Sequence, residues 1–173
     1  MARPIQPTIR THSHSAEAEG GVTPQEYREA LAHWATGVAV LAASDGDEVE
    51  AITVTAFSPL SADPPLVLAC LGNYAAVLYV LEDAGRFTVN LLAAEDRRAA
   101  SAFSQRMPPE PGRFSAGRDP VLQGAFVSLV CRLVETHPGG DHRIVVGQVE
   151  QIVLGDGEAD PLLYYRREYR TLA

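Results

Sequence analysis

The stretch "VEAITVTAFSPLSADPPLVLACL" (residues 49–71) decides the fold class of this chain. From residue 51 to 57 the side chains alternate between two faces, one apolar and one rich in threonine, which is the period of a β-strand. The segment "SADPPL" must be a turn, because Pro64 and Pro65 cannot donate the hydrogen bonds of a strand ladder. The apolar run "LVLACL" follows as a short strand, so the stretch predicts two strands joined by a turn.

The rest of the chain continues as strands separated by short helices. Further strands are expected over residues 38–43, 86–92, 125–135 and 143–154, and helices over residues 23–37, 75–85 and 95–105. The first helix starts with a capping box formed by Thr23 and Glu26, with Pro24 at the first helical position. Strands and helices do not alternate as β-α-β-α, so we expect a mainly β protein with short helices, folded as an antiparallel barrel.

Length and charge limit the classes of function. A chain of 173 residues is expected to form one domain, here residues 23–173, preceded by a flexible tail over residues 1–22. The net charge of -8 argues against nucleic acid as a partner and disfavours an anionic membrane surface. No apolar run is long enough to span a bilayer, so a cytoplasmic location is expected.

Several common catalytic machineries are missing. All 14 basic residues are arginine, which excludes a Walker lysine and a lysine Schiff base. The sequence has no Rossmann glycine motif, no G-x-S-x-G elbow and no CxxC or HExxH metal motif, and we expect no metal site. Cys70 and Cys131 lie in apolar runs and are predicted to be buried thiols without a disulfide.

Polar residues at the predicted strand ends remain as candidates for a site. Thr53 and Thr55 share one strand face, which either offers hydroxyls to a ligand or merely reflects the strand preference of threonine. The junction at residues 72–74 either binds a phosphate at a helix N-terminus or is an ordinary helix cap. The loop "RMPPEPGRFSAGRDP" (residues 106–120) is long enough to suggest a functional or interface role.

The order of these motifs resembles that of a known family. The segments "HWATGVAVLAASDGDE", "AITVTAFSPLSADPPLVLACL", "AGRFTVNLLAAEDRRAASAFS", "GDHRIVVGQV" and "PLLYYRREYRTL" are similar to the short-chain flavin reductases, which have the FMN-binding split-barrel fold. The resemblance implies a homodimer that uses NADH or NADPH to reduce free FMN or FAD. It also implies a flavin-dependent monooxygenase as the functional partner that receives the reduced flavin.

The resemblance also implies roles for particular residues. The residues that line the flavin would be Thr53, Val54, Thr55, Ala56 and Phe57, together with Phe87, Thr88, Val89 and Asn90. The flavin phosphate would meet Asn73, Tyr74 and Ala75. His142 would contact the nicotinamide nucleotide, and Tyr169 would close the site. Asp141 either orients the His142 ring or simply forms the turn.

This chain departs from the family pattern at the expected phosphate site. Ala56 stands where the family often has serine, and Tyr74 and Ala75 stand where serines commonly follow the preceding strand. The loss of hydroxyl donors leaves a second function open, a non-catalytic flavin carrier or sensor. Hydride transfer needs two stacked rings and no acid, base or nucleophile, so the missing machineries do not exclude an enzyme.

Overall fold

The computed structural model describes residues 21–155 and 159–172, and the chain divides into two units, residues 1–31 and 32–173. In the first unit, helix α1 (Pro24–Leu31) begins at the predicted capping box, where Thr23 Oγ1 accepts the Glu26 N–H at 3.2 Å. The helix was expected to reach Gly37, and this prediction is wrong. Gly37 belongs to strand β1 (Thr36–Gly37), because pairing with a C-terminal strand replaces the helix there. The predicted flexible tail lies almost wholly outside the described residues.

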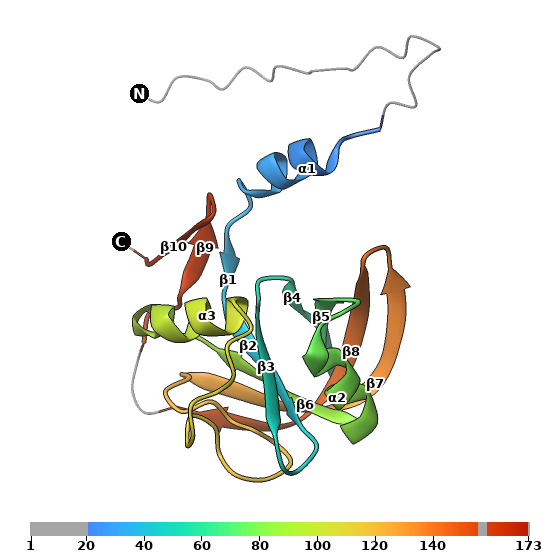
Figure 1. The fold of residues 1–173 in the computed structure, drawn as a ribbon, viewed down its shortest axis with the longest axis vertical. Helices are drawn as coiled ribbons and strands as arrows, with labels where there is room; N and C mark the ends of the chain where they lie inside the picture. Colours follow the sequence, from blue (N-terminus) through green and yellow to red (C-terminus); the bar gives the residue numbers. More distant parts are fainter. Residues whose placement is uncertain (1–20, 156–158, 173) are drawn as a thin grey trace. The chain divides into compact units, whose positions relative to one another are not determined.

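The second unit is built on an antiparallel sheet of seven strands (Figure 1). Their order in the sheet is β3-β2-β6-β7-β8-β5-β4. The strands are β2 (Ala39–Ser44), β3 (Val49–Val54), β4 (Phe57–Ala62), β5 (Pro65–Gly72), β6 (Arg86–Leu91), β7 (Val127–Gly139) and β8 (His142–Leu154). All six neighbouring pairs are antiparallel, so the predicted fold class is confirmed.

The two edge strands of this sheet follow each other directly in the sequence. Residues 49–57 were expected to form one strand, but the chain leaves β3 at Val54 and starts β4 at Phe57 on the opposite edge. Three residue steps span at most roughly 11 Å, so the sheet must curl until its edges approach each other. This is a barrel split between β3 and β4.

A second, three-stranded sheet lies near the C-terminus. It has the order β1-β9-β10, with β9 (Leu163–Tyr165) in the centre and β10 (Glu168–Arg170) at one edge. The turn between β9 and β10 consists of Arg166 and Arg167, which have positive φ angles of 51° and 64°. Left-handed backbone at two non-glycine residues is unusual, and the tight antiparallel turn requires it.

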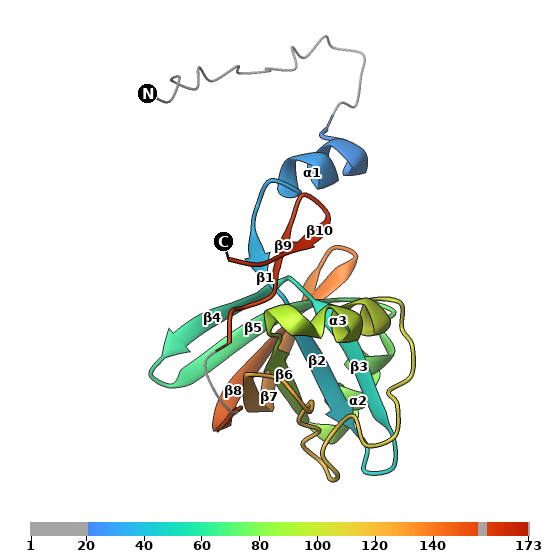
Figure 2. The same cartoon turned by 90° about the vertical axis from the view of Figure 1, so that its left-hand side faces the viewer.

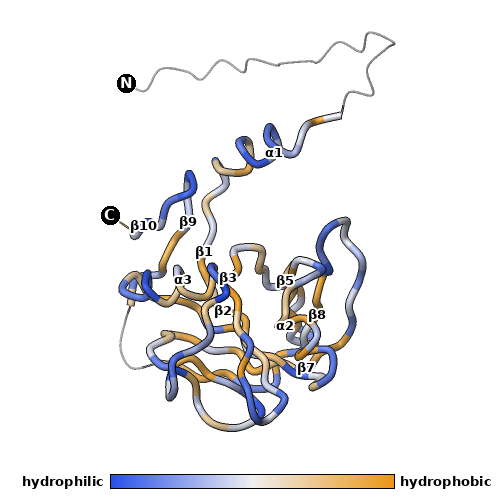
Figure 3. The backbone as a smooth tube through the Cα atoms, viewed as in Figure 1, coloured by the Kyte–Doolittle hydropathy of each residue, from blue (hydrophilic) through white to orange (hydrophobic). Residues whose placement is uncertain are grey.

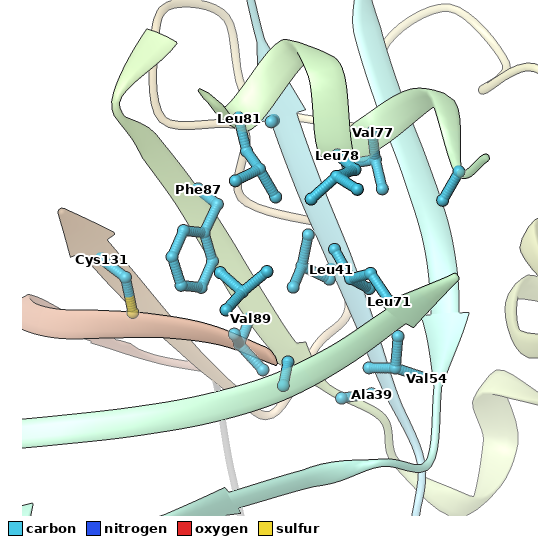
Figure 4. Close-up of a cluster of buried hydrophobic side chains, with 14 of the residues drawn as sticks. Ala39, Leu41, Val54, Leu71, Val77, Leu78, Leu81, Phe87, Val89 and Cys131 are labelled. Carbon is cyan, nitrogen blue, oxygen red and sulfur yellow. The ribbon is translucent and has the colours of Figure 1, made fainter. Parts of the chain in front are cut away.

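Helices cover both faces of strand β2, which is buried along its whole length. Odd-numbered residues such as Leu41 pack inside the barrel against α2 (Ala76–Ala84), whose Val77, Leu78 and Leu81 point toward them (Figure 4). Even-numbered residues pack outside against α3 (Arg97–Ser104), which follows the 3₁₀ turn η1 (Ala94–Asp96) and lies beside β2 and β3 (Figure 2). α2 ends, as predicted, at Gly85, which has a φ of 65°.

The barrel interior tolerates little extra volume. A Cβ atom added at Gly147 would lie 2.3 Å from Cζ of Phe87 and 3.1 Å from Cβ of Cys131. Cys131 is fully buried, and desolvation raises the pKa of its thiol to about 12. Both cysteines are unpaired, as predicted. Figure 3 shows hydrophobic residues on β2 and β3 and a hydrophilic turn between β9 and β10.

No helix in the described part of the chain is both long and apolar enough to cross a membrane.

Candidate functional site

A cavity of about 500 Å³ lies beside the edge strand β3. Its wall is formed by the β2–β3 turn and β3 (Asp47, Glu48, Val49, Glu50, Ala51, Ile52), the start of α2 (Ala75, Ala76, Val77), and the loop after α3 (Arg106, Met107, Pro108, Pro109, Glu110, Pro111, Gly112, Phe114). The volume is in the range that small-molecule and cofactor sites occupy. The cavity brings together three segments that are far apart in the sequence.

Strand β3 presents its edge to this cavity. Four consecutive residues, Val49–Ile52, line the cavity, whereas a strand that presented one face would contribute alternate residues. In the sheet β3 pairs only with β2, so its outer row of N–H and C=O groups has no strand partner. This edge can therefore hydrogen-bond the polar rim of a flat ligand.

The start of α2 supplies a second set of backbone donors. The N–H groups of Ala76 and Val77 belong to the first turn, where a helix has no internal acceptors for them. Ala75 occupies the N-cap position and provides no side-chain cap. Because the helix dipole is positive at this end, the two amides suit an anionic group.

The outer wall of the cavity is the proline-rich loop after α3. Its start is fixed to α3, since the N–H of Met107 donates to Ala102 O at 3.1 Å. Further along, Phe114 pairs with Leu122 in an isolated antiparallel bridge and packs against Phe103, with ring centroids 5.6 Å apart. This loop, expected from its length to have a functional or interface role, thus forms one wall of the cavity.

A buried polar network holds the far end of this loop. Thr88 Oγ1 donates to Pro120 O at 2.6 Å, and Asn90 Oδ1 accepts the Leu122 N–H at 2.9 Å and the Ser128 hydroxyl at 2.7 Å. The Asn90 side-chain amide also donates to Thr88 Oγ1 at 3.0 Å. Thr88, Asn90 and Ser128 are completely or almost completely buried, so these bonds fix the loop to the barrel.

Residues 87–90, which the family resemblance places beside the flavin, do not line this cavity. Phe87, Thr88, Val89 and Asn90 are all buried in the chain, and none of them lines the cavity. Their strand, β6, lies between β2 and β7, so its backbone groups pair with neighbouring strands. The motif R-F-x-V-N therefore supports the core and fixes the far end of the loop.

The charges around the cavity are mostly negative. Asp47, Glu48, Glu50 and Glu110 line it, and Arg106 is the single cationic side chain among the described lining residues. At the adjoining turn, hydrogen bonds from the N–H groups of Glu48 and Asp47 lower the pKa of Asp45. The β2–β3 turn therefore carries negative charge at neutral pH.

The predicted residues around Asn73 and His142 form one corner of the molecule. Gly72 of β5 pairs with His142 of β8, and Asn73 fixes the β7–β8 turn by donating its N–H to Asp141 O at 3.0 Å and its side-chain amide to Gly140 O at 3.1 Å. Tyr74 is 84% exposed beside it. The corner adjoins the cavity through Ala75, although neither Asn73 nor His142 lines the cavity.

His142 is oriented by its neighbour in the sequence. Its Nδ1 lies 2.7 Å from Asp141 Oδ1, and its side chain is 47% exposed. Of the two alternatives for Asp141, the structure contains the hydrogen bond that an orienting role requires. With Nδ1 engaged, Nε2 and the ring face are the parts available to a second molecule.

Residues 53–57, which the family resemblance places beside the flavin, lie in different environments. The Thr53 hydroxyl donates to Ala100 O at 2.7 Å and thereby fixes α3, and Val54 is in the core. Half-buried Thr55 and exposed Ala56 form the crossing between the sheet edges, next to the cavity residue Ile52. Phe57 lines a second, smaller cavity of about 140 Å³.

Tyr169 is not close to His142 within one chain. It lies in β10 and packs edge-on against Tyr164, with ring centroids 5.5 Å apart. Figure 1 shows β10 on the opposite side of the barrel from the turn that joins β7 and β8. The two residues predicted to bind the nicotinamide nucleotide are thus separated.

The fold and the cavity define a split-barrel protein that can hold a flat, nucleotide-sized ligand at an open strand edge. The family model described as flavin reductase like domain matches residues 31–173, and the chain belongs to that family. The resemblance seen in the sequence motifs is therefore confirmed.

Individual relatives agree with this assignment. The chain is 46% identical over 148 residues (86% of this chain, 96% of the relative) to the reductase component of 4-hydroxyphenylacetate 3-monooxygenase from Thermus thermophilus. It is 35% identical over 163 residues (91% and 92%) to an NADH-dependent flavin reductase from a Rhodococcus species. The NADH:FAD oxidoreductase SgcE6 of Streptomyces globisporus C-1027, solved with NAD and FAD fragments, superimposes with a TM-score of 0.79 at 26% identity (89% and 97% covered).

Proposed function

We propose that the protein is an NADH-dependent flavin reductase, which reduces FMN or FAD and passes the reduced flavin to a flavin-dependent monooxygenase. The observation that carries the proposal is the cavity at the open edge of β3, which has the size and the backbone donors for a flavin. The names of the two curated relatives support both the hydride donor and the partner. A cytoplasmic location, expected from the sequence, is part of the proposal.

The flavin would lie along β3 in this arrangement. Backbone groups of Val49–Ile52, continued by Thr55 and Ala56 at the crossing, would hydrogen-bond the polar edge of the ring system. The phosphate end would meet the first-turn amides of α2, which follow Asn73–Ala75. The loop 106–112 would cover the ligand and exclude water.

The chemistry requires positioning alone. With both molecules bound, NADH would supply a hydride and water a proton to the flavin, which would balance as NAD⁺ and the two-electron reduced flavin. The contribution of the chain is to hold both rings with the reacting atoms roughly 3 to 3.5 Å apart. His142, oriented by Asp141, would bind the nicotinamide nucleotide at the corner next to the cavity.

A homodimer is part of this proposal. Tyr169 and His142 lie on different sides of one chain, so Tyr169 can close a site only in a second copy of the chain. Size-exclusion chromatography with light scattering would measure the oligomeric state. A monomer at micromolar concentration would exclude this role of Tyr169.

The proposal is tested by NADH and NADPH oxidation at 340 nm with FMN or FAD as the acceptor. Flavin-dependent consumption is expected with NADH. The His142→Ala variant should raise the KM for NADH and leave the KM for flavin nearly unchanged. Flavin binding without NADH oxidation would instead favour the carrier function, and a selective loss of flavin affinity in His142→Ala would refute the role given to His142.

A further inference from the structure

Arg106 is an unpaired cation on the cavity wall. Its guanidinium makes no hydrogen bond or ion pair with any residue in the ranges 21–155 and 159–172, although Glu50 and Glu110 line the same cavity. Some arginines have carboxylate partners, such as Arg86 with Asp119 at 2.8 Å. Exposed arginines such as Arg97 and Arg98 also have no partner among the described residues, but Arg106 is the arginine that lines the cavity. A guanidinium left without a partner beside a cavity is available to a ligand.

The backbone holds this side chain at a defined place. Arg106 has a φ of 57°, and its N–H donates to Phe103 O at 3.3 Å directly after α3. The next residue, Met107, is also bonded to α3. The base of the arginine is therefore fixed on the wall of the cavity that the residue lines.

On these grounds we propose that Arg106 recognises the phosphate of the flavin, and so determines the preference for phosphorylated flavins. This proposal rests on the proposed function. A phosphate entering the cavity meets the carboxylates of Asp47, Glu48, Glu50 and Glu110, which repel it. The chain has no lysine, and Ala75 at the helix start offers no hydroxyl, so the compensating charge comes from Arg106.

The test compares FMN with riboflavin, which has the same ring and ribityl chain but no phosphate. The variants are Arg106→Gln, Arg106→Lys and, as a matched control, Arg118→Gln. Arg118 is exposed on the same loop but does not line the cavity, and its replacement by glutamine removes the same charge as Arg106→Gln. Binding is measured by quenching of flavin fluorescence, and the KM values for both flavins and for NADH are measured at 340 nm.

Loss of one charge-assisted hydrogen bond to an exposed arginine should weaken FMN binding about tenfold in Arg106→Gln. Riboflavin binding should change by less than about twofold, Arg106→Lys should recover part of the affinity for FMN, and Arg118→Gln should resemble the wild type.

Three results would overturn the proposal. Equal weakening of FMN and riboflavin would mean that the variant only disturbs the loop. An equal effect of Arg118→Gln on FMN binding would mean that the charge acts at long range. A rise confined to the KM for NADH in Arg106→Gln would mean that Arg106 binds the dinucleotide and not the flavin. A wild-type protein that binds and reduces neither flavin would instead refute the proposed function.

Discussion

Replacement of Thr88 by valine tests whether the buried network holds the cavity wall. Valine keeps the shape of the side chain but removes the hydroxyl that donates to Pro120 O at 2.6 Å and accepts from Asn90 at 3.0 Å. Both partners then lose a buried hydrogen bond, at about 1 to 1.5 kcal/mol each, so the free energy of unfolding should fall by about 2 to 3 kcal/mol. For a domain of this length, the Tm should fall by about 4 to 12 °C.

Urea unfolding gives the free energy, and limited trypsin digestion reports on the loop, which contains Arg106, Arg113 and Arg118. Thr88→Val should be cut in this loop faster than the wild type. Thr88→Ser is the control, because it keeps the hydroxyl and loses only one methyl group, at about 1 kcal/mol. If Thr88→Val were no less stable than Thr88→Ser, or if its loop were equally resistant to trypsin, the network would not be the anchor.

Two further predictions concern the barrel interior. Gly147→Ala should reduce the free energy of unfolding by about 1 to 3 kcal/mol, because the new Cβ would lie 2.3 Å from Cζ of Phe87. The control Gly37→Ala, whose new Cβ would have no atom within 4 Å, should change the free energy by less than about 0.5 kcal/mol. Equal shifts of the Tm in the two variants would contradict the steric argument. Burial raises the pKa of Cys131 to about 12, so roughly one Cys131 thiol in ten thousand is ionised at pH 8. Iodoacetamide should therefore modify half-buried Cys70 in the native protein, and Cys131 only after unfolding. Mass spectrometry of the native protein measures this, and alkylation of Cys131 before Cys70 would contradict the prediction.

The sequence was a good guide to elements and a poor guide to where strands meet. Alternation over residues 51–57 and the prolines at 64 and 65 correctly indicated strands on either side of a turn, because side-chain period and proline chemistry are local properties, but β4 (Phe57–Ala62) was not predicted as a separate strand. The break after Val54 was missed, since Thr55 and Ala56 have no turn signal and the curl of the sheet alone requires the crossing. The end of α1 was missed because β1 pairs with a strand more than a hundred residues later.

The candidate site was likewise predictable where local motifs mark it and unpredictable where the three-dimensional packing decides it. The family resemblance led to the region of α2 and to the corner at Asn73 and His142, which the structure brings together. Asn90 was expected beside the ligand, and only the three-dimensional structure shows that β6 is a central strand whose Thr88 and Asn90 are buried on the outer face of the barrel, under the far end of the loop. Arg106 belonged to a loop that was flagged for its length, and nothing in the sequence distinguishes it from the arginines around it.

The open edge of β3 has a consequence for the protein without its ligand. A bare row of amides and carbonyls is a template on which another extended chain can pair, and such pairing leads to aggregation. Glu48 and Glu50 lie at this edge, and repulsion between two such acidic edges discourages self-association. A ligand hydrogen-bonded along β3 would act as a missing neighbour of the strand, so saturation with flavin should slow amide hydrogen exchange there and keep concentrated solutions clear.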